Sequence, residues 1–194
     1  MEKLTTAITN AIQVNNPDLT DLQIIKIKFG IQCLLSEFSK FCMYILIFSI
    51  FSSTGYFLTA MFSFCIFRAF SGGYHEETYW RCFFTTFFLF ILIIFIGIKM
   101  SLSLWTWVGG LTLGGIITAV YAPVDHPNKP IISLKRRTRL KVLSVIVFML
   151  FILGSLLLSG AYKNIMLAAI IVQAFTLPLG FIKKKHIENR QLKI

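Results

Sequence analysis

Long apolar stretches separated by short polar segments make up most of the chain after residue 37. A helix needs about 20 apolar residues to cross a bilayer, and the last four stretches approach or reach that length. We expect six transmembrane helices, at Phe38–Phe51, Tyr56–Phe70, Tyr79–Ile98, Leu102–Tyr121, Val142–Ser159 and Ile165–Ile182. The first two are short and share a turn at 52–55, so a re-entrant hairpin with four full spans is the alternative.

The first 36 residues have a weaker pattern. Apolar residues recur at helical spacing between Leu4 and Val14, a turn follows at Asn15–Asp18, and Asp18 or Thr20 can cap a second helix. Both stretches fit helices lying on the membrane surface, and helices exposed to water are the alternative. The stretch lacks the apolar core and cleavage site of a signal peptide, so the first span itself would direct insertion.

Composition gives the class of protein. Of the 194 residues, 56% are hydrophobic and only 14% are charged, and Phe alone occurs 20 times. A water-soluble domain of this length needs a larger charged fraction to cover its surface. We therefore expect an all-α, polytopic membrane helix bundle in a single domain over residues 1–194. It would have interfacial helices at 1–36, transmembrane helices over 38–182 and a basic tail at 183–194.

The net charge of +11 is concentrated in two places. Basic residues lie between the fourth and fifth spans and in the tail: Lys129, Lys135, Arg136, Arg137, Arg139, Lys141, Lys183, Lys184, Lys185, Arg190 and Lys193. The positive-inside rule puts both places, both termini and the 68–82 segment in the cytoplasm. The run Lys135–Lys141 has a second interpretation, attraction of anionic membrane lipid or of an acidic peptide tail. We expect no nucleic-acid partner.

Four cysteines and one run of small residues complete this description. Cys33, Cys42 and Cys65 lie in apolar stretches and are expected to be small buried hydrophobes. Cys82 would face a reducing cytosol and stay a thiol. The Gly110–Gly114 face in the fourth span favours close packing within the chain, and a homodimer contact is the alternative.

The segment between the second and third spans carries the candidate chemistry. His75 and Cys82 are seven residues apart, which on one unbroken helix separates them by about 10 Å along the axis. The segment must fold back for a proton to pass between them, and Gly72–Gly73 permits this. Thr78 can cap the third span, which would place Cys82 in its first turns, where the helix dipole stabilises a thiolate. Cys82 is then the nucleophile and His75 its general base.

Several polar neighbours have supporting roles that the spacing leaves open. Glu76, Glu77 or Asp125 could orient the imidazole, and Arg68 could bind a substrate carboxylate, pair with one of these acids or simply anchor the interface. A metal site is the rival interpretation, but His75–Tyr79 lacks the second histidine of a zinc-protease helix. Cys82, Asp125 and His126 would complete a ligand set only through tertiary contact. We expect no metal and no cofactor.

The second unusual segment is Tyr121–Pro130, where three prolines in eight residues forbid a helix and stiffen the loop. It follows the fourth span on the expected cytoplasmic side and can lie against the 68–82 segment. Asp125, His126 and Lys129 are its polar groups. A structural stop to the span is the simpler interpretation.

Together, Arg68, Gly73, His75, Cys82, the proline run and the basic stretch after it resemble the accessory gene regulator protein B (AgrB) family over nearly the whole chain. The resemblance implies a bacterial cell-membrane cysteine endopeptidase of quorum sensing, with a propeptide of the AgrD kind as substrate. His75 and Cys82 match the catalytic pair, and Arg68 and Gly73 match positions that are also required. The thiolate would cut off the propeptide's C-terminal tail, and the acyl-enzyme thioester would then yield a thiolactone or lactone ring.

Two other functions compete with this hypothesis. A non-enzymatic membrane peptide transporter would need ionisable residues along a path, and the third to sixth spans are almost free of them. A lipid-modifying enzyme with Cys82 as acyl carrier is the other. Loss of cleavage on replacing Cys82 or His75 would separate the peptidase from the transporter.

Overall fold

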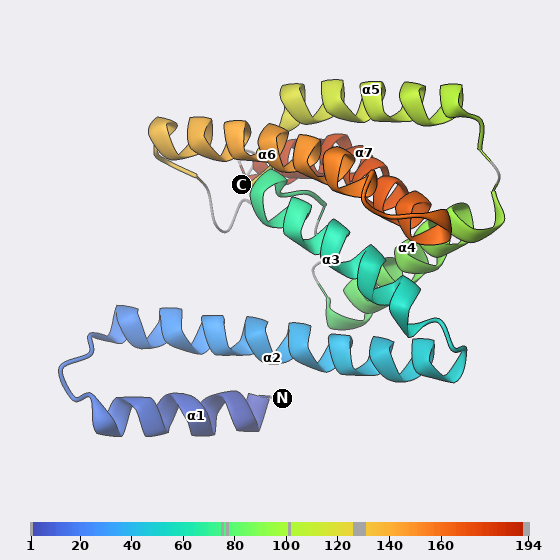
Figure 1. The fold of residues 1–194 in the computed structure, drawn as a ribbon. Coiled ribbons are helices and arrows are strands. Elements are labelled where there is room, and N and C mark those ends of the chain that lie inside the picture. The colour runs from blue at the N-terminus through green and yellow to red at the C-terminus, as the bar shows by residue number, and fades with distance from the viewer. Residues whose placement is uncertain (1, 75, 77, 101, 126–130, 192–194) are drawn as a thin grey trace. The chain divides into compact units, whose positions relative to one another are not determined.

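The computed structural model describes residues 2–74, 76, 78–100, 102–125 and 131–191, which form seven α-helices and one isolated β-bridge (Figure 1). The helices are α1 (Glu2–Asn15), α2 (Asp21–Ile50), α3 (Thr54–Ser71), α4 (Tyr79–Lys99), α5 (Leu104–Tyr121), α6 (Leu134–Ser155) and α7 (Gly160–Gln191). The expected all-α fold is confirmed.

The chain divides into two compact units, Met1–Ser52 and Ser53–Ile194. In the first unit, α1 packs against α2. The second unit contains α3 to α7 and all the residues of the site described below. The expectation of one domain over the whole chain stays a prediction.

Helix α2 differs from the expected pattern of an interfacial helix followed by a separate span. It runs without a break over 30 residues, from the expected interfacial stretch into the first expected span, so the two form one helix. Thr20 does cap it, because the Gln23 side-chain oxygen accepts hydrogen bonds from the Thr20 backbone N–H at 2.9 Å and from its hydroxyl at 3.1 Å. Lys40, within the apolar part, is buried and pairs with Glu37 one turn earlier, so the two charges do not interrupt the helix.

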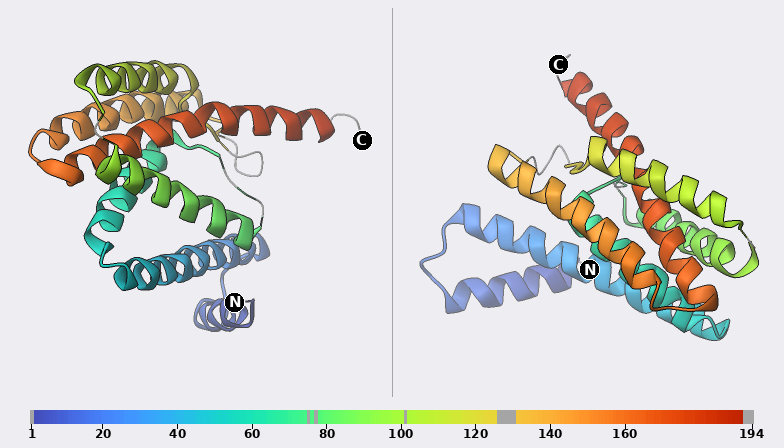
Figure 2. Two further views of the ribbon diagram at one scale, coloured as in Figure 1. Left: turned by 90° about the vertical axis from the view of Figure 1, so that its right-hand side faces the viewer. Right: turned by 45° about the horizontal axis from the view of Figure 1, so that its top comes forward.

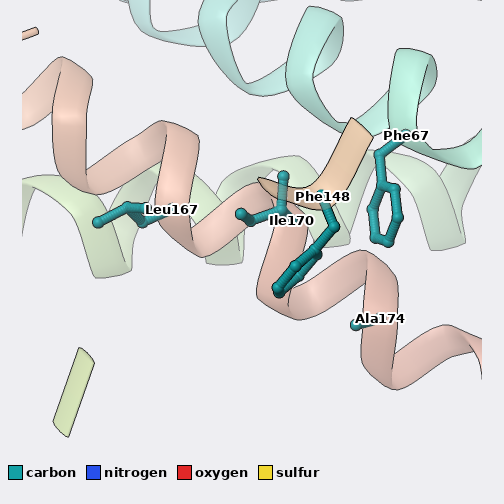
Figure 3. Packing of buried hydrophobic residues seen from close by; sticks show 5 residues of the cluster. All are labelled: Phe67, Phe148, Leu167, Ile170 and Ala174. Atoms are coloured by element: carbon teal, nitrogen blue, oxygen red, sulfur yellow. The ribbon is translucent and has the colours of Figure 1, made fainter. Parts of the chain in front are cut away.

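Helix α7 is the centre of the second unit and packs against α3, α4, α5 and α6. Figure 2 shows it between α4 and the α5–α6 pair, with its C-terminal turns extending past its neighbours. A core cluster joins Phe67 of α3 and Phe148 of α6 to three residues of α7 (Figure 3). The two rings lie 5.5 Å apart between centroids. A helix enclosed on so many sides needs an almost continuous apolar surface, which explains the unbroken run at 165–172.

Five of the described helices, α2 and α4 to α7, are long and apolar enough to cross a membrane. Their outer surfaces carry large exposed apolar side chains such as Phe88, Leu113, Met149 and Leu153. Such surfaces suit a multi-pass membrane protein, because lipid replaces the protein core as the apolar environment. The expected number of about six transmembrane helices is roughly consistent with these five candidates. Whether α3 crosses the membrane, and which side each end faces, stay predictions.

These exposed apolar surfaces also explain why the predicted burial of three cysteines is wrong. Cys33, Cys42 and Cys65 were expected to be buried, but all three are exposed on the surfaces of their helices. Their apolar surroundings in the sequence reflect a face turned away from the protein interior. By contrast, the Gly110–Gly114 face packs within the chain: a Cβ at Gly110 would lie 3.2 Å from Ile171, and one at Gly114 would lie 3.4 Å from Phe148.

Two helices extend beyond their expected limits. Helix α6 begins at Leu134, so the basic run Lys135–Lys141 forms its first two turns. Helix α7 continues through Pro178 to Gln191, so the first part of the expected basic tail is helical. Lys183 and Lys184 therefore lie on the same rigid element as the buried core of the unit.

Candidate functional site

The site is built around the turn that ends α3. Gly72 has φ +70°, a conformation that favours glycine. Its backbone N–H donates to the Arg68 carbonyl at 2.9 Å, and the preceding Ser71 carbonyl accepts from the Val124 N–H at 2.9 Å. A side chain at Gly72 would overlap the Val124 carbonyl. The turn after α3 is thereby paired with the loop after α5, and the expected contact between these two segments is confirmed.

Gly73 lies where this segment passes over α7. Its φ is +143°, and a Cβ there would come within 2.9 Å of the Thr176 hydroxyl, 3.0 Å of the Gln173 amide nitrogen and 3.5 Å of the Arg68 guanidinium. On the other side of the contact, a Cβ at Gly180 would lie 2.8 Å from the Gly73 carbonyl carbon and 2.9 Å from the Tyr74 nitrogen. Two glycines, one on each surface, allow the backbone to approach the helix this closely.

Gln173 is the polar centre of the contact and has no exposed surface. Its amide nitrogen donates to the Gly72 carbonyl at 2.7 Å and to the Ser71 hydroxyl at 3.3 Å. Its amide oxygen accepts from the Arg68 guanidinium at 3.4 Å and from the Thr176 hydroxyl at 3.1 Å. Both ends of the side chain are satisfied, as a buried amide requires.

Arg68 lies in the last turn of α3. Besides Gln173, it donates to the Tyr74 carbonyl, and it lies 5.6 Å from the centroid of the Phe64 ring. The guanidinium thus joins α3, α7 and the segment after the glycines. These contacts give Arg68 a role that the sequence did not suggest, because it holds the segment that leads to residue 75.

Glu76 is held by the same segment and by α7. The Tyr74 hydroxyl donates to one carboxylate oxygen at 2.8 Å, and the Lys183 ammonium lies 3.7 Å from the other. Lys183 also lies 4.7 Å from the centroid of the Tyr74 ring. Its cation therefore contacts both a carboxylate and a ring face, which fixes this part of the segment against the helix.

Asp125, in the loop after α5, makes an equivalent contact one residue along α7. Lys184 donates to one carboxylate oxygen at 2.6 Å and the Ile131 backbone N–H to the other at 2.9 Å. Burial alone would raise the pKa of this carboxyl, but these hydrogen bonds outweigh burial and hold the pKa below its ordinary value. Asp125 is thus a fixed carboxylate that joins Ile131 to Lys184 of α7.

Cys82 lies in the first turn of α4, as expected. The helix begins at Tyr79 with Thr78 at the N-cap position, and the Cys82 N–H donates to the Thr78 carbonyl at 3.0 Å. The Thr78 side chain itself makes no capping hydrogen bond. The Cys82 side chain is half-buried.

The remaining candidates lie outside the described residues: His75, Glu77, His126 and Lys129. The distance from Cys82 to His75 therefore stays a prediction. The described residues contain no group of three or more His, Cys, Asp and Glu side chains that could hold a metal ion. The rival metal site, which depends on His75 or His126, is not tested by that observation.

Sequence reasoning missed the contribution of α7. Gln173, Thr176 and Gly180 are spaced three and four residues apart, and Lys183 and Lys184 continue the same helical face. The signal was an amide inside an otherwise apolar run, followed at helical spacing by a hydroxyl, a glycine and two cations. Polar residues within a membrane helix usually face other helices, and this face meets the glycine turn.

Comparisons with known proteins match most of the chain, and the matched proteins bear the name of one family. The family model "Accessory gene regulator B" matches residues 4–177. An AgrB-like protein of Clostridium beijerinckii is 29% identical over 174 residues, 88% of this chain and 84% of its own. Accessory gene regulator protein B of Staphylococcus aureus strain N315 is 29% identical over 86% of this chain and 89% of its own. The Staphylococcus epidermidis protein of that name is 26% identical over 89% and 88%. No solved structure matches the chain significantly.

Proposed function

Because the chain belongs to the accessory gene regulator B family, we propose that it is a membrane cysteine endopeptidase that matures a quorum-sensing propeptide. Cys82 is the nucleophile and His75 the base. The substrate is an AgrD-like propeptide, and the products are its C-terminal tail and a thiolactone or lactone macrocycle. The alternative is a peptide transporter that carries out no chemistry.

The chemistry proceeds by two acyl transfers. The Cys82 thiolate attacks the scissile carbonyl, the C–N bond breaks, and the His75 imidazolium gives its proton to the leaving amine. The acyl group is now a thioester on Cys82. A thiol or hydroxyl within the propeptide then loses its proton to His75 and attacks the same carbonyl, and Cys82 leaves as thiolate. No cofactor or nucleotide is required, since exchange of one thioester for another conserves the bond energy.

The observation that carries the proposal is convergence on one face of α7. Residues that the sequence selects for chemistry, Arg68, Gly73, Glu76 and Asp125, come from two distant parts of the chain, the 68–76 stretch and the loop after α5, and all contact that face. A hydrogen-bonded junction of this kind positions a reactive segment at the end of an apolar bundle. Ring closure must compete with hydrolysis, so the site must also exclude water and preorganise the internal nucleophile.

We also propose the setting in which the enzyme works. It lies in the bacterial cell membrane with both termini and the active site facing the cytoplasm, following the positive-inside rule. Anionic lipid is a second partner, for which a groove of about 380 Å³ between α5, α6 and α7 is suited. Tyr121 and Phe181 supply its apolar wall, and Arg137 and Lys141 supply positive charge.

Mass spectrometry of a candidate propeptide incubated with the purified protein tests the function. Wild-type protein should yield a tail-less product and a thioester on Cys82. Cys82→Ser and His75→Ala should lower the cleavage rate by at least about 10³-fold, as loss of a nucleophile or its base does. Cys65→Ser, which replaces an exposed cysteine of α3, is the control and should cleave normally. Cleavage by Cys82→Ser at the wild-type rate would refute the peptidase, whereas transport of uncut peptide by both active-site variants would support the transporter.

A further inference from the structure

The buried amide in α7 has no role in the chemistry proposed above, and its contacts give it one. We propose that Gln173 is a positioning residue: it holds the Gly72 carbonyl and the Arg68 guanidinium, and so sets the path of the Gly72–Tyr74 segment. The proposal rests on the proposed function only for its effect on catalysis. The positional effect itself can be measured without a substrate.

A glutamine is favourable at this buried position only if both polar ends of its amide have hydrogen-bond partners. A fully buried amide in an apolar helix is costly unless both its polar ends are hydrogen bonded, and a leucine of similar size would fill the same space without that cost. Here the amide nitrogen meets the Gly72 carbonyl at 2.7 Å and the amide oxygen meets Arg68 at 3.4 Å. Among uncharged side chains of this length, only glutamine both donates and accepts in this way.

The Gly72 carbonyl, an acceptor, and the Arg68 guanidinium, a donor, fix the orientation of the amide. The Thr176 hydroxyl lies one turn further along the helix, 2.8 Å from the Gln173 carbonyl and 3.1 Å from its amide oxygen. If the amide were reversed, its oxygen would face the Gly72 carbonyl and two acceptors would be in contact. The donor is therefore directed at Gly72 and the acceptor at Arg68.

The effect continues along the segment through Arg68. The guanidinium that Gln173 binds also donates to the carbonyl of Tyr74, the residue before His75. Gln173 thus fixes the backbone twice, directly at Gly72 and through Arg68 at Tyr74. It acts on the base through these neighbours and takes no part in bond making.

Two variants distinguish the contact of Gln173 with Gly72 from its contact with Arg68. Gln173→Leu removes both hydrogen-bonding ends at similar size. Gln173→Glu keeps an acceptor for Arg68 but, as a carboxylate, cannot donate to the Gly72 carbonyl. The matched control is Thr118→Val in α5, which removes a fully buried hydroxyl that bonds only within its own helix in the described contacts, at 2.8 Å to the Gly114 carbonyl.

Hydrogen exchange gives the measurement without substrate. The Val124 amide donates to the Ser71 carbonyl across this junction, and the Gly72 amide donates to the Arg68 carbonyl at the end of α3. We expect both Gln173 variants to exchange these amides about tenfold faster than wild type, and Thr118→Val to leave them unchanged. With propeptide, kcat per folded molecule should fall about 10- to 100-fold with KM within about threefold, since the misplaced group acts on the chemical step.

Each result decides the proposal. Wild-type exchange and kcat in Gln173→Glu would overturn it, because donation to Gly72 would then be dispensable. A lower melting temperature with unchanged kcat and exchange in Gln173→Leu would also overturn it, and Gln173 would be an ordinary core residue. If Gln173→Leu does not fold, Gln173→Glu decides alone. If wild-type protein cleaves no propeptide, the proposed function fails, and the exchange rates still settle the positioning role.

Discussion

Replacing Gly180 by alanine tests whether close approach of the glycine turn to α7 matters. The added methyl group would lie 2.8 Å from the Gly73 carbonyl carbon and 2.9 Å from the Tyr74 nitrogen. Both are backbone atoms, so neither can rotate away. To reach an ordinary contact of about 3.4 Å, the segment or the helix must move by about 0.6 Å.

Gly109→Ala is the matched control for this change. Both glycines lie inside helices, so alanine gains about 1 kcal/mol of helix propensity at each position. A Cβ at Gly109 would have no atom within 4 Å, whereas overpacking at Gly180 costs about 1–3 kcal/mol. Gly180→Ala should therefore be less stable than Gly109→Ala by about 1–3 kcal/mol.

The same displacement should affect catalysis. Misplacement of a reacting group by about 1 Å costs about 100-fold in rate, so a shift of about 0.6 Å should lower propeptide cleavage by about tenfold. The assay is the cleavage rate per folded molecule, with thermal unfolding in detergent alongside. Equal rates and equal unfolding temperatures for the two variants would refute the reasoning, since the contact would then accommodate a methyl group freely.

Two further predictions concern the charged residues around the junction. Because the pKa of Asp125 is lowered in the folded protein, its contribution, about 1–2 kcal/mol, is fully present above the ordinary aspartate value of about 4 and is lost as the pH falls through the lower folded-state value. Asp125→Asn should therefore unfold at a lower temperature than wild type at pH 7, and the difference should shrink as the pH falls below about 4, where the wild-type carboxylate takes up a proton. A difference that does not change with pH would contradict the ion pair. For the lipid groove, Arg137→Gln with Lys141→Gln should weaken binding of phosphatidylglycerol by about 10- to 30-fold in native mass spectrometry, at about 1 kcal/mol per cation. Lys135→Gln with Arg136→Gln, which removes two charges outside the groove, should weaken it less than threefold, and an equal loss in the two double variants would show that only net charge matters.

The sequence alone determined the membrane helices and the start of α4. Apolar length, charge placement and the cap position at Thr78 are local properties, and they located α4, α5 and the first turn that carries Cys82 close to their observed limits. The sequence also indicated that Gly72 and Gly73 use conformations open to glycine, and their φ values are +70° and +143°. These features depend on contacts between residues near one another in the chain.

Only the tertiary structure selected α7 as the element that holds the site. Gln173 lies about 100 residues from its partners Ser71 and Gly72, and no period or spacing in the sequence joins them. The pairing arises because α7 packs against four other helices, and its polar face then meets the turn after α3, where the Gly72 carbonyl accepts from Gln173. The sequence could not identify the partners of Arg68, Glu76 and Asp125 for the same reason. A charged residue near the apolar bundle requires a partner, but the packing of distant helices decides which residue that partner is.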